Sequence, residues 1–239
     1  MGSHMIKLIT FDLDHTLWDV DPVIIKAEQK MRAWVAQHLP EAVAHLEMDQ
    51  LKGVYKHLRD QHPELLHHPT NFRKKLLHTV FSQLDISHDH ALDMTEQAFQ
   101  VFYEGRNDIE LFHEAENILQ QLSQRFPLIA LSNGNANLKM VGIDQYFVGH
   151  YSAETEGKAK PHQAMFLRAL EHVNATPQQA IHIGDNPKED VEAARAAGYN
   201  TIWFNENNKQ AEGLCNPTRE IHHLNQLLQA VDAIEKSAV

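Results

Sequence analysis

The sequence lacks the features that mark several large classes of protein. Its 239 residues include one cysteine, Cys215, so an internal disulfide is excluded and we expect an inert thiol in a reducing environment. No stretch approaches the roughly 18 apolar residues of a membrane span, and no signal peptide is recognisable. We therefore expect a cytoplasmic protein with no membrane partner.

Positive charge is also scarce. The chain has 21 Lys and Arg residues against 32 Asp and Glu residues, which gives a formal net charge of −11. A non-specific nucleic-acid-binding protein needs a basic face to displace counterions, so we expect no nucleic-acid partner. An anionic small substrate remains compatible with this charge only if a local cation offsets the repulsion.

Histidine, by contrast, is abundant, with 18 residues. The pairs His67–His68 and His222–His223 lack Cys or carboxylate neighbours at ligand spacing. We therefore do not expect zinc binding at either pair.

The pattern of apolar residues changes twice along the chain. Residues 1–4, at the start of MGSHM, are interpreted as the remnant of an expression tag and carry no argument. A β-rich run over residues 6–11 is followed by helix after helix across residues 20–107, punctuated by prolines. After residue 108, short apolar strands alternate with amphipathic helices, which favours a parallel sheet covered on both faces. The strands are expected at residues 6–11, 127–133, 180–185 and 199–204, and the helices at residues 114–126, 162–173 and 188–198.

This pattern predicts an α/β fold, a Rossmann-like doubly wound parallel sheet with an inserted all-helical cap domain. The sheet would be built by residues 5–19 and 108–239, and the cap by residues 20–107. The hinges are expected at residues 18–20 and 105–108.

Polar residues follow three of the expected strands. Asp12 follows the first, Ser132 and Asn133 end the second, and Asp185 follows the third. Ligands of open α/β sheets bind beyond the carboxyl ends of the strands, so we expect these residues to form one site.

Four segments in order carry a resemblance to a known family. They are DLDHT (12–16), LSNGN (131–135), KAKPH (158–162) and GDNPKED (184–190). Together they resemble the four signature motifs of the haloacid dehalogenase-like hydrolase superfamily, whose helical cap lies where the helical insertion falls here. The stretches TFDLDHTLWDVDPVI and PLIALSNGNA are similar to the branch that contains bacterial flavin mononucleotide phosphatases and riboflavin-pathway pyrimidine phosphatases. The resemblance implies hydrolysis of a small phosphate ester.

The two acids of the first motif are predicted to have separate roles. Asp12, at the strand tip, would attack phosphorus and form an aspartyl-phosphate. Asp14, two residues further on, would protonate the leaving oxygen and then take a proton from water. Thr16, in the same motif, is a secondary candidate.

A hard cation would reconcile a carboxylate nucleophile with an anionic phosphate, and Mg²⁺ prefers such oxygen ligands. The resemblance implies three ligands: the Asp12 carboxylate, the Asp14 backbone carbonyl and Asp185. Asp190 would either touch a metal-bound water or cap the following helix, and both readings stay open.

Phosphate binding is predicted to involve the second and third motifs. Ser132 offers a hydroxyl and Asn133 an amide, beside a glycine that lets backbone N–H groups approach. Lys160 is favoured over Lys158 to bridge the nucleophile and the phosphoryl oxygens, because the Lys-Pro step matches the family motif. Pro161 is expected to start the next helix.

The helical insertion gives the weakest signal. Arg73, in the basic stretch at residues 70–75, is a candidate for contacting substrate or an ordinary solvated side chain. The alternatives to a phosphatase are a 2-haloacid dehalogenase, a phosphomutase and a non-catalytic binding module. The second acid, Asp14, argues against a dehalogenase, because dehalogenases of the superfamily do not carry it. The sequence names neither the physiological substrate nor the oligomeric state, which we expect to be a monomer or a homodimer.

Overall fold

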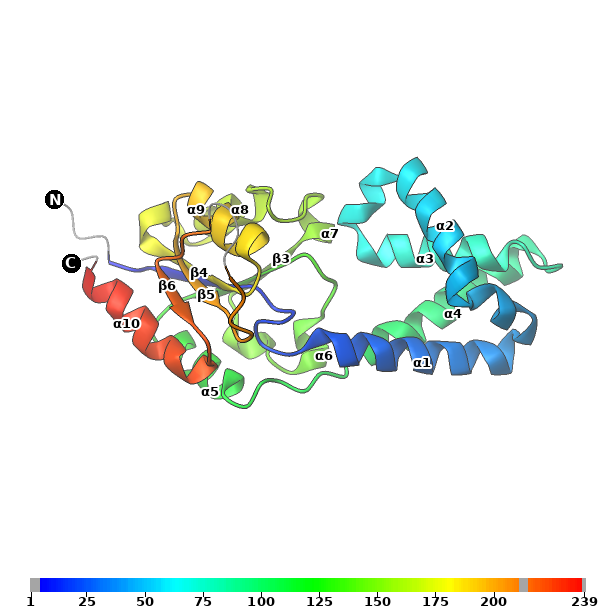
Figure 1. The fold of residues 1–239 in the computed structure, drawn as a ribbon, viewed down its shortest axis with the longest axis horizontal. Coiled ribbons are helices and arrows are strands. Elements are labelled where there is room, and N and C mark those ends of the chain that lie inside the picture. Colours follow the sequence, from blue (N-terminus) through cyan, green and yellow to red (C-terminus); the bar gives the residue numbers. More distant parts are fainter. Residues whose placement is uncertain (1–4, 211–214, 238–239) are drawn as a thin grey trace. The chain divides into compact units, whose positions relative to one another are not determined.

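The computed structural model describes residues 5–210 and 215–237 (Figure 1). The chain divides into two units. We call the part up to Asp19 and from Glu110 onward the core unit, and Val20–Ile109 the helical unit. No helix in the described residues has the length and apolarity needed to cross a membrane. A cap role for the helical unit stays a prediction.

The core unit is built on a six-stranded sheet in which every pairing is parallel. Its order is β3-β2-β1-β4-β5-β6, so the first strand of the chain lies between β2 and β4. The chain adds β2 and β3 on one side of β1 and then β4, β5 and β6 on the other side. The change of side occurs at β1, which is the topological switch point of a doubly wound sheet, and it confirms the predicted fold class. The strands are β1 Leu8–Phe11, β2 Leu128–Ser132, β3 Gly149–Ser152, β4 Ala180–Gly184, β5 Asn200–Phe204 and β6 Arg219–Ile221.

Helices cover both sides of this sheet. Figure 1 shows α8 (Ala164–Val173) and α9 (Ala193–Ala196) on one side, with α5 (Ala115–Ser123) and α10 (Leu227–Ser237) on the other. The apolar residues of α8 recur at helical spacing and pack against buried residues of β1 and β2. The remaining helical segments are α6 Leu138–Val141, η3 Asp144–Tyr146, α7 Ala153–Glu156, η4 Pro177–Gln179, the π-helical η5 Pro187–Glu192 and η6 Leu224–Gln226.

The core unit differs from expectation in several places, and α10 is one helix that was not predicted. The edge strands β3 and β6 were not predicted, because they are short and only partly buried, so they lack a continuous apolar run. Pro161 does not start a helix, because α8 begins at Ala164 and the Lys160–Pro161 peptide bond is cis. The helix expected at residues 188–198 begins as the π-helical η5.

The helical unit consists of helices with an apolar interior. Its segments are α1 Val20–His38, η1 Pro40–Leu46, α2 Met48–Gln61, η2 Pro63–His67, α3 Pro69–Phe81 and α4 His88–Arg106. Prolines begin η1, η2 and α3, where the missing N–H has no intrahelical partner in any case. Ser87 caps α4 by accepting a hydrogen bond from the His90 N–H at 3.2 Å.

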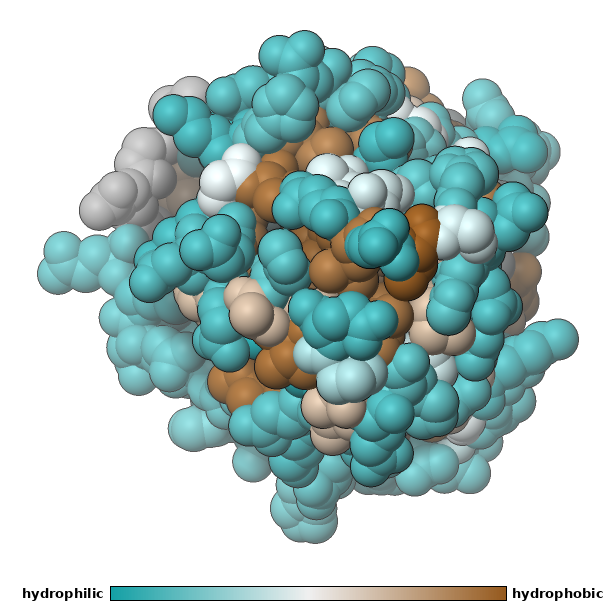
Figure 2. Space-filling model, turned by 90° about the vertical axis from the view of Figure 1, so that its right-hand side faces the viewer, coloured by the Kyte–Doolittle hydropathy of each residue, from teal (hydrophilic) through white to brown (hydrophobic). Residues whose placement is uncertain are grey.

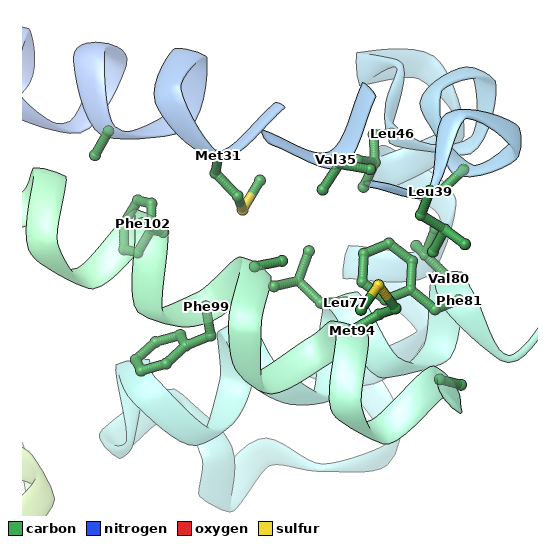
Figure 3. Close-up of a cluster of buried hydrophobic side chains, with 14 residues drawn as sticks. Met31, Val35, Leu39, Leu46, Leu77, Val80, Phe81, Met94, Phe99 and Phe102 are labelled. Atoms are coloured by element: carbon green, nitrogen blue, oxygen red, sulfur yellow. The ribbon is translucent and has the colours of Figure 1, made fainter. Parts of the chain in front are cut away.

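The core of the helical unit comes from α1, η1, α3 and α4. Figure 3 shows Met31 and Val35 of α1 directed toward Leu77 of α3 and Met94 of α4. The helices α1 and α4 approach closely at Gly105, where an added Cβ would lie 2.9 Å from the Ala27 Cα. Figure 2 shows that the face it draws also exposes apolar surface between hydrophilic side chains. The interior of this unit thus consists of apolar side chains that pack against one another.

Candidate active site

The site lies at the carboxyl ends of β1, β2 and β4. Asp12 directly follows β1, and its backbone N–H donates to Ile183 O of β4 at 2.8 Å. The hydrogen bonding between β1 and β4 therefore extends to Asp12, and only 7% of the Asp12 residue is exposed. Asp185 follows the neighbouring β4, so both carboxylates lie at one edge of the sheet. The geometry places Asp12 where the sheet holds its backbone most firmly.

Lys160 joins two buried carboxylates. Its Nζ donates to Asp12 Oδ1 and to Asp190 Oδ1, each at 2.6 Å. Burial alone would lower the pKa of the Lys160 ammonium, but the Asp12 and Asp190 carboxylates together raise that pKa above its usual value. Lys158, the rival candidate, is exposed. The structure therefore places a protonated Lys160 against the predicted nucleophile.

Asp185 adds a third carboxylate beside this pair. Oxygens of Asp12, Asp185 and Asp190 lie within 4.8 Å of one another. Burial, reinforced by Asp190, raises the pKa of Asp185 to about 6, and burial raises the pKa of Asp12 well above its usual value despite Lys160. Burial would also raise the pKa of Asp190, but Lys160 and a hydrogen bond from His182 lower it overall. Such crowding of carboxylates with too little positive charge fits a hard divalent cation.

Asp190 is the best satisfied of the three acids. Besides Lys160, its carboxylate accepts from His182 Nε2 at 3.1 Å and from the Asn186 N–H at 3.0 Å. The start of η5 is capped by the Asn186 side chain, which accepts from the N–H groups of residues 188 and 189. Asp190 therefore helps to close the first turn of η5 by accepting from the N-cap residue, and its contact with a metal-bound water stays a prediction. Asp12 and Asp185 are left as the carboxylates best suited to hold a cation.

Asp14 has surroundings distinct from those of Asp12. Its Oδ1 accepts from the indole Nε1 of Trp18 at 2.8 Å, and Trp18 is completely buried. Between them His15 adopts a left-handed conformation, with φ of 63°, and its N–H donates to Trp18 O at 2.8 Å. This turn separates the Asp14 carboxylate from the three-acid cluster. The Thr16 hydroxyl instead donates to Asp12 Oδ2 at 3.2 Å.

The second motif positions Lys160 as well as offering groups to a ligand. Asn133 Oδ1 accepts from Lys160 N at 2.7 Å, and its Nδ2 donates to Lys160 O at 3.0 Å and to Glu189 Oε2 at 2.9 Å. Both amide hydrogens of Asn133 thus have protein acceptors, which favours a role in holding the Lys160 loop. Ser132 Oγ accepts from the Gly134 N–H at 2.9 Å, and its own hydrogen can be donated to a phosphoryl oxygen.

Sequence reasoning missed several residues that hold the site together. His182 is buried between Thr10 and Asp190, yet within AIHIGD it reads as part of an apolar strand. The Trp203 indole donates to Asp185 O at 2.9 Å. Gly184 offered a usable signal, because a Cβ there would lie 2.3 Å from the Asp190 Cγ. A glycine six residues before a buried acid can mark the space which that acid fills.

The remaining candidates lie elsewhere. Arg73, in α3, forms an ion pair with Glu28 and its guanidinium carbon lies 3.5 Å from the centre of the Phe102 ring. Cys215 is partly buried, and burial raises the pKa of its thiol, in keeping with an inert group. No cluster of potential metal ligands within residues 5–210 and 215–237 includes either histidine pair.

Comparison with known proteins gives a consistent family. A family model described as a haloacid dehalogenase-like hydrolase matches residues 6–198. Among curated proteins, the 5-amino-6-(5-phospho-D-ribitylamino)uracil phosphatase YigB of Escherichia coli (strain K12) is 29% identical over 203 residues, which cover 85% of each chain. The pyrimidine 5'-nucleotidase PynA of Streptococcus pneumoniae (strain ATCC BAA-255 / R6) is 24% identical over 242 residues, covering 95% of each chain.

A solved structure bears a different functional name. The 2-haloacid dehalogenase from Pseudomonas syringae pv. Tomato DC3000 superposes with a TM-score of 0.92 at 34% identity, covering 96% of this chain and 99% of that one. The resemblance to riboflavin-pathway phosphatases is thus confirmed, and a protein described as a dehalogenase is also similar.

Proposed function

Because this chain belongs to the haloacid dehalogenase-like hydrolase family, we propose that it hydrolyses small phosphomonoesters with Mg²⁺ as its metal ion. One observation carries this proposal. The two acids of the first motif have different partners, since Asp12 pairs with Lys160 whereas Asp14 is held by Trp18. A nucleophile and a separate general acid beside it suit the cleavage of a phosphate ester, whose leaving oxygen needs a proton.

The proposed reaction uses these residues in two steps. An Asp12 carboxylate oxygen attacks phosphorus, the bond from phosphorus to the ester oxygen breaks, and Asp14 gives its proton to that oxygen. Asp14, now ionised, then takes a proton from water as the water attacks the aspartyl-phosphate, which releases inorganic phosphate and restores Asp12. The Lys160 ammonium and the Ser132 hydroxyl stabilise the charge on the equatorial oxygens.

The acidic cluster supports the choice of metal ion. The carboxylates of Asp12 and Asp185 and the backbone carbonyl of Asp14 would hold Mg²⁺, with Asp190 fixed on Lys160 beside them. The bound ion would supply positive charge to offset the repulsion between the carboxylate nucleophile and the phosphate. Asp12 and Asp185 need that charge, because Lys160 is shared with Asp190.

The relatives suggest a substrate class. YigB is described as acting on a phosphorylated ribitylaminouracil, and PynA as acting on pyrimidine 5'-nucleotides. We therefore propose a phosphorylated polyol or sugar that carries a pyrimidine or flavin ring. Flavin mononucleotide and the ribitylaminouracil phosphate are the first compounds to test.

A dehalogenase is the second candidate, because a structure described as a 2-haloacid dehalogenase is 34% identical. Halide is a stable anion, so its departure needs no proton donor. A neutral carbon–halogen centre also creates no need for a divalent cation beside the nucleophile. The indole-bound Asp14 and the three-acid cluster therefore favour phosphate ester cleavage.

The test measures both reactions on the same purified protein. We expect hydrolysis of p-nitrophenyl phosphate that stops with EDTA and returns with Mg²⁺ or Mn²⁺ but not with Ca²⁺, which prefers more ligands and longer bonds. Asp185→Ala should weaken activation by Mg²⁺ markedly. Halide release from 2-chloropropionate without phosphatase activity would establish the dehalogenase instead, and full phosphatase activity in metal-free buffer would exclude the metal-dependent mechanism.

A further inference from the structure

His182 is a buried histidine that the reaction does not use directly. It lies on β4 and is 1% exposed. Its Nδ1 lies 2.8 Å from Thr10 Oγ1 of β1, and its Nε2 lies 3.1 Å from Asp190 Oδ1 of η5. One ring therefore connects the central pair of strands to the acid that binds Lys160.

The strand register places this ring beneath the site. Thr10 and His182 are partners in the parallel β1–β4 pairing. Thr10 is two residues before Asp12, and residues two apart on a strand face the same side of a sheet. His182 likewise precedes Gly184 by two residues, and Asp190 fills the space above that glycine. The contact between Thr10 and His182 is thus one layer below the nucleophile.

The partners determine the direction of each hydrogen bond. An ionised carboxylate only accepts, so Nε2 carries a hydrogen and donates to Asp190. Burial lowers the pKa of the His182 ring, which favours its neutral form. Nδ1 of the neutral ring is then the acceptor, and the Thr10 hydroxyl donates to it at 2.8 Å, since the other acceptor of Thr10, Ile181 O, is 3.4 Å away. Thr10 therefore keeps the hydrogen of the neutral ring on the nitrogen that faces Asp190.

Two donors share one oxygen of Asp190. His182 Nε2 and Lys160 Nζ both donate to Oδ1, and Lys160 also donates to Asp12 Oδ1. Without the histidine donor, Lys160 would be the sole donor to Asp190 Oδ1. The ammonium would then shift toward Asp190 and away from the nucleophile.

We infer that His182 is a positioning residue which, through Asp190, keeps the Lys160 ammonium in contact with Asp12. The inference rests on the proposed phosphatase function, and it assigns Thr10 the role of orienting the ring. Partners that act one step behind a reacting group typically change activity by about 10- to 100-fold. The effect belongs mainly in kcat, because the contact of Lys160 with Asp12 and the equatorial oxygens matters most in the transition state.

Three substitutions test the role of His182. His182→Leu removes the donor and should lower kcat about 10- to 100-fold while KM stays within about threefold. His182→Gln keeps an N–H that can reach Asp190, and should recover at least about a third of wild-type kcat. Phe166→Leu is the matched control, because the Phe166 ring packs edge-on against His182, with 5.0 Å between ring centroids, and has no polar atom to donate to Asp190. It should lower the melting temperature and leave kcat unchanged.

Thr10 provides an independent pair of variants. Thr10→Val keeps the shape and removes the hydroxyl, whereas Thr10→Ser keeps the hydroxyl. We expect Thr10→Val to lower kcat and Thr10→Ser to restore it. In a double variant with His182→Leu, the further loss from Thr10→Val should nearly vanish, because both act through one chain of hydrogen bonds. If His182→Leu does not fold, the Thr10 pair decides the matter alone.

Other outcomes separate this inference from the proposed function. Wild-type kcat in the folded His182→Leu variant, or equal losses in His182→Leu and His182→Gln, overturns the positioning role. No phosphatase activity in the wild-type protein refutes the proposed function, and crystal structures then decide the positioning role. In His182→Leu the Lys160 Nζ should lie beyond the roughly 3.2 Å limit of a hydrogen bond from Asp12 Oδ1. An unchanged Lys160 position overturns the inference.

Discussion

The core unit and the helical unit bury different kinds of side chain. In the core unit, Asp12, Lys160 and Asp190 are nearly inaccessible and in direct contact. The interior of the helical unit is a cluster of 14 apolar residues drawn in Figure 3. Buried charges are costly unless they are paired, so a protein retains them where they do chemistry. Substitutions should therefore separate the two units, with losses of activity in one and of stability in the other.

Asp12→Asn is the substitution from which we expect the largest effect. It removes the attacking oxygen with little change of shape, so turnover should fall more than 10³-fold, roughly 4 kcal/mol of barrier. The variant should retain the far-ultraviolet circular dichroism of the wild type. More than a tenth of wild-type activity in this variant would rule out the covalent mechanism. An unfolded variant would show that Asp12 is needed for stability as well as for activity, against the proposed difference between the two units.

Asp14→Asn tests whether the second acid has its own role. General acid assistance is worth about 10²–10⁴-fold, and an alkyl phosphate should lose most of it because its alkoxide leaves poorly unprotonated. With p-nitrophenyl phosphate the first step should suffer less, so aspartyl-phosphate should accumulate as its hydrolysis loses the base. Rapid-quench kinetics with both substrates measures this. Equal slowing of both, with no intermediate, would leave Asp14 a structural residue of the turn that contains Trp18.

Phe81→Ala addresses the interior of the helical unit. Phe81 is completely buried, and its truncation should cost about 3–5 kcal/mol of the free energy of unfolding. Urea titration followed by circular dichroism measures the loss. Leu92→Ala, at a residue 43% exposed in the same unit, should cost less than about 0.5 kcal/mol. Similar losses in both variants would mean that the cluster does not stabilise the unit.

Asp185→Asn should weaken activation by Mg²⁺ and raise the melting temperature of the metal-free protein. The pKa of Asp185 is raised to about 6, so above that pH its ionised form destabilises the fold. In EDTA at pH 7.5 we expect the variant to melt a few degrees higher than the wild type. The difference should shrink as the pH falls from about 6 toward 3, because the folded carboxyl takes up its proton near pH 6 and the unfolded one only below its ordinary pKa of 3.8. A lower melting temperature in EDTA would contradict this electrostatic account.

Arg73→Ala should have the smallest effect. Its guanidinium is engaged by Glu28 and the Phe102 ring, which together are worth about 1 kcal/mol of stability at a partly exposed site. We expect kcat/KM to stay within about threefold of wild type. Lys75→Ala, an exposed charge of the same helix, controls for loss of charge. A tenfold loss of kcat/KM in Arg73→Ala alone would make Arg73 a substrate contact and weaken the contrast between the units.

The sequence predicted the parts of this arrangement that follow from local patterns. The apolar runs ending at Asp12, Ser132 and Asp185 located three strands and the edge of the sheet that carries the site. β3 and β6 were not predicted, because edge strands are partly exposed to solvent and do not need continuous apolar residues. The contact of His182 with Thr10 spans 172 residues and depends on strand register, which no local pattern reveals.

Asp190 shows the same limit inside a motif. Its spacing from Asp185 left a helix cap and a metal-shell residue equally open. Its observed contacts depend on Lys160, 30 residues away, and on the space above Gly184, which the motif alone does not reveal. Motifs identify which residue types are present, whereas their partners follow from the packed fold.

The position of β1 has a consequence for how the chain is made. β1 is synthesised first, yet its neighbours β2 and β4 begin at residues 128 and 180. The helical unit is continuous in sequence and is synthesised completely before β2, so it can fold on the ribosome while β1 is still unpaired. An unpaired apolar strand is prone to aggregate, so this early period is when the nascent chain most needs a chaperone. Moving residues 5–19 to a position just before β2 would shorten the time for which β1 is synthesised but unpaired. This rearranged chain should give a higher soluble yield, with a smaller gain in melting temperature.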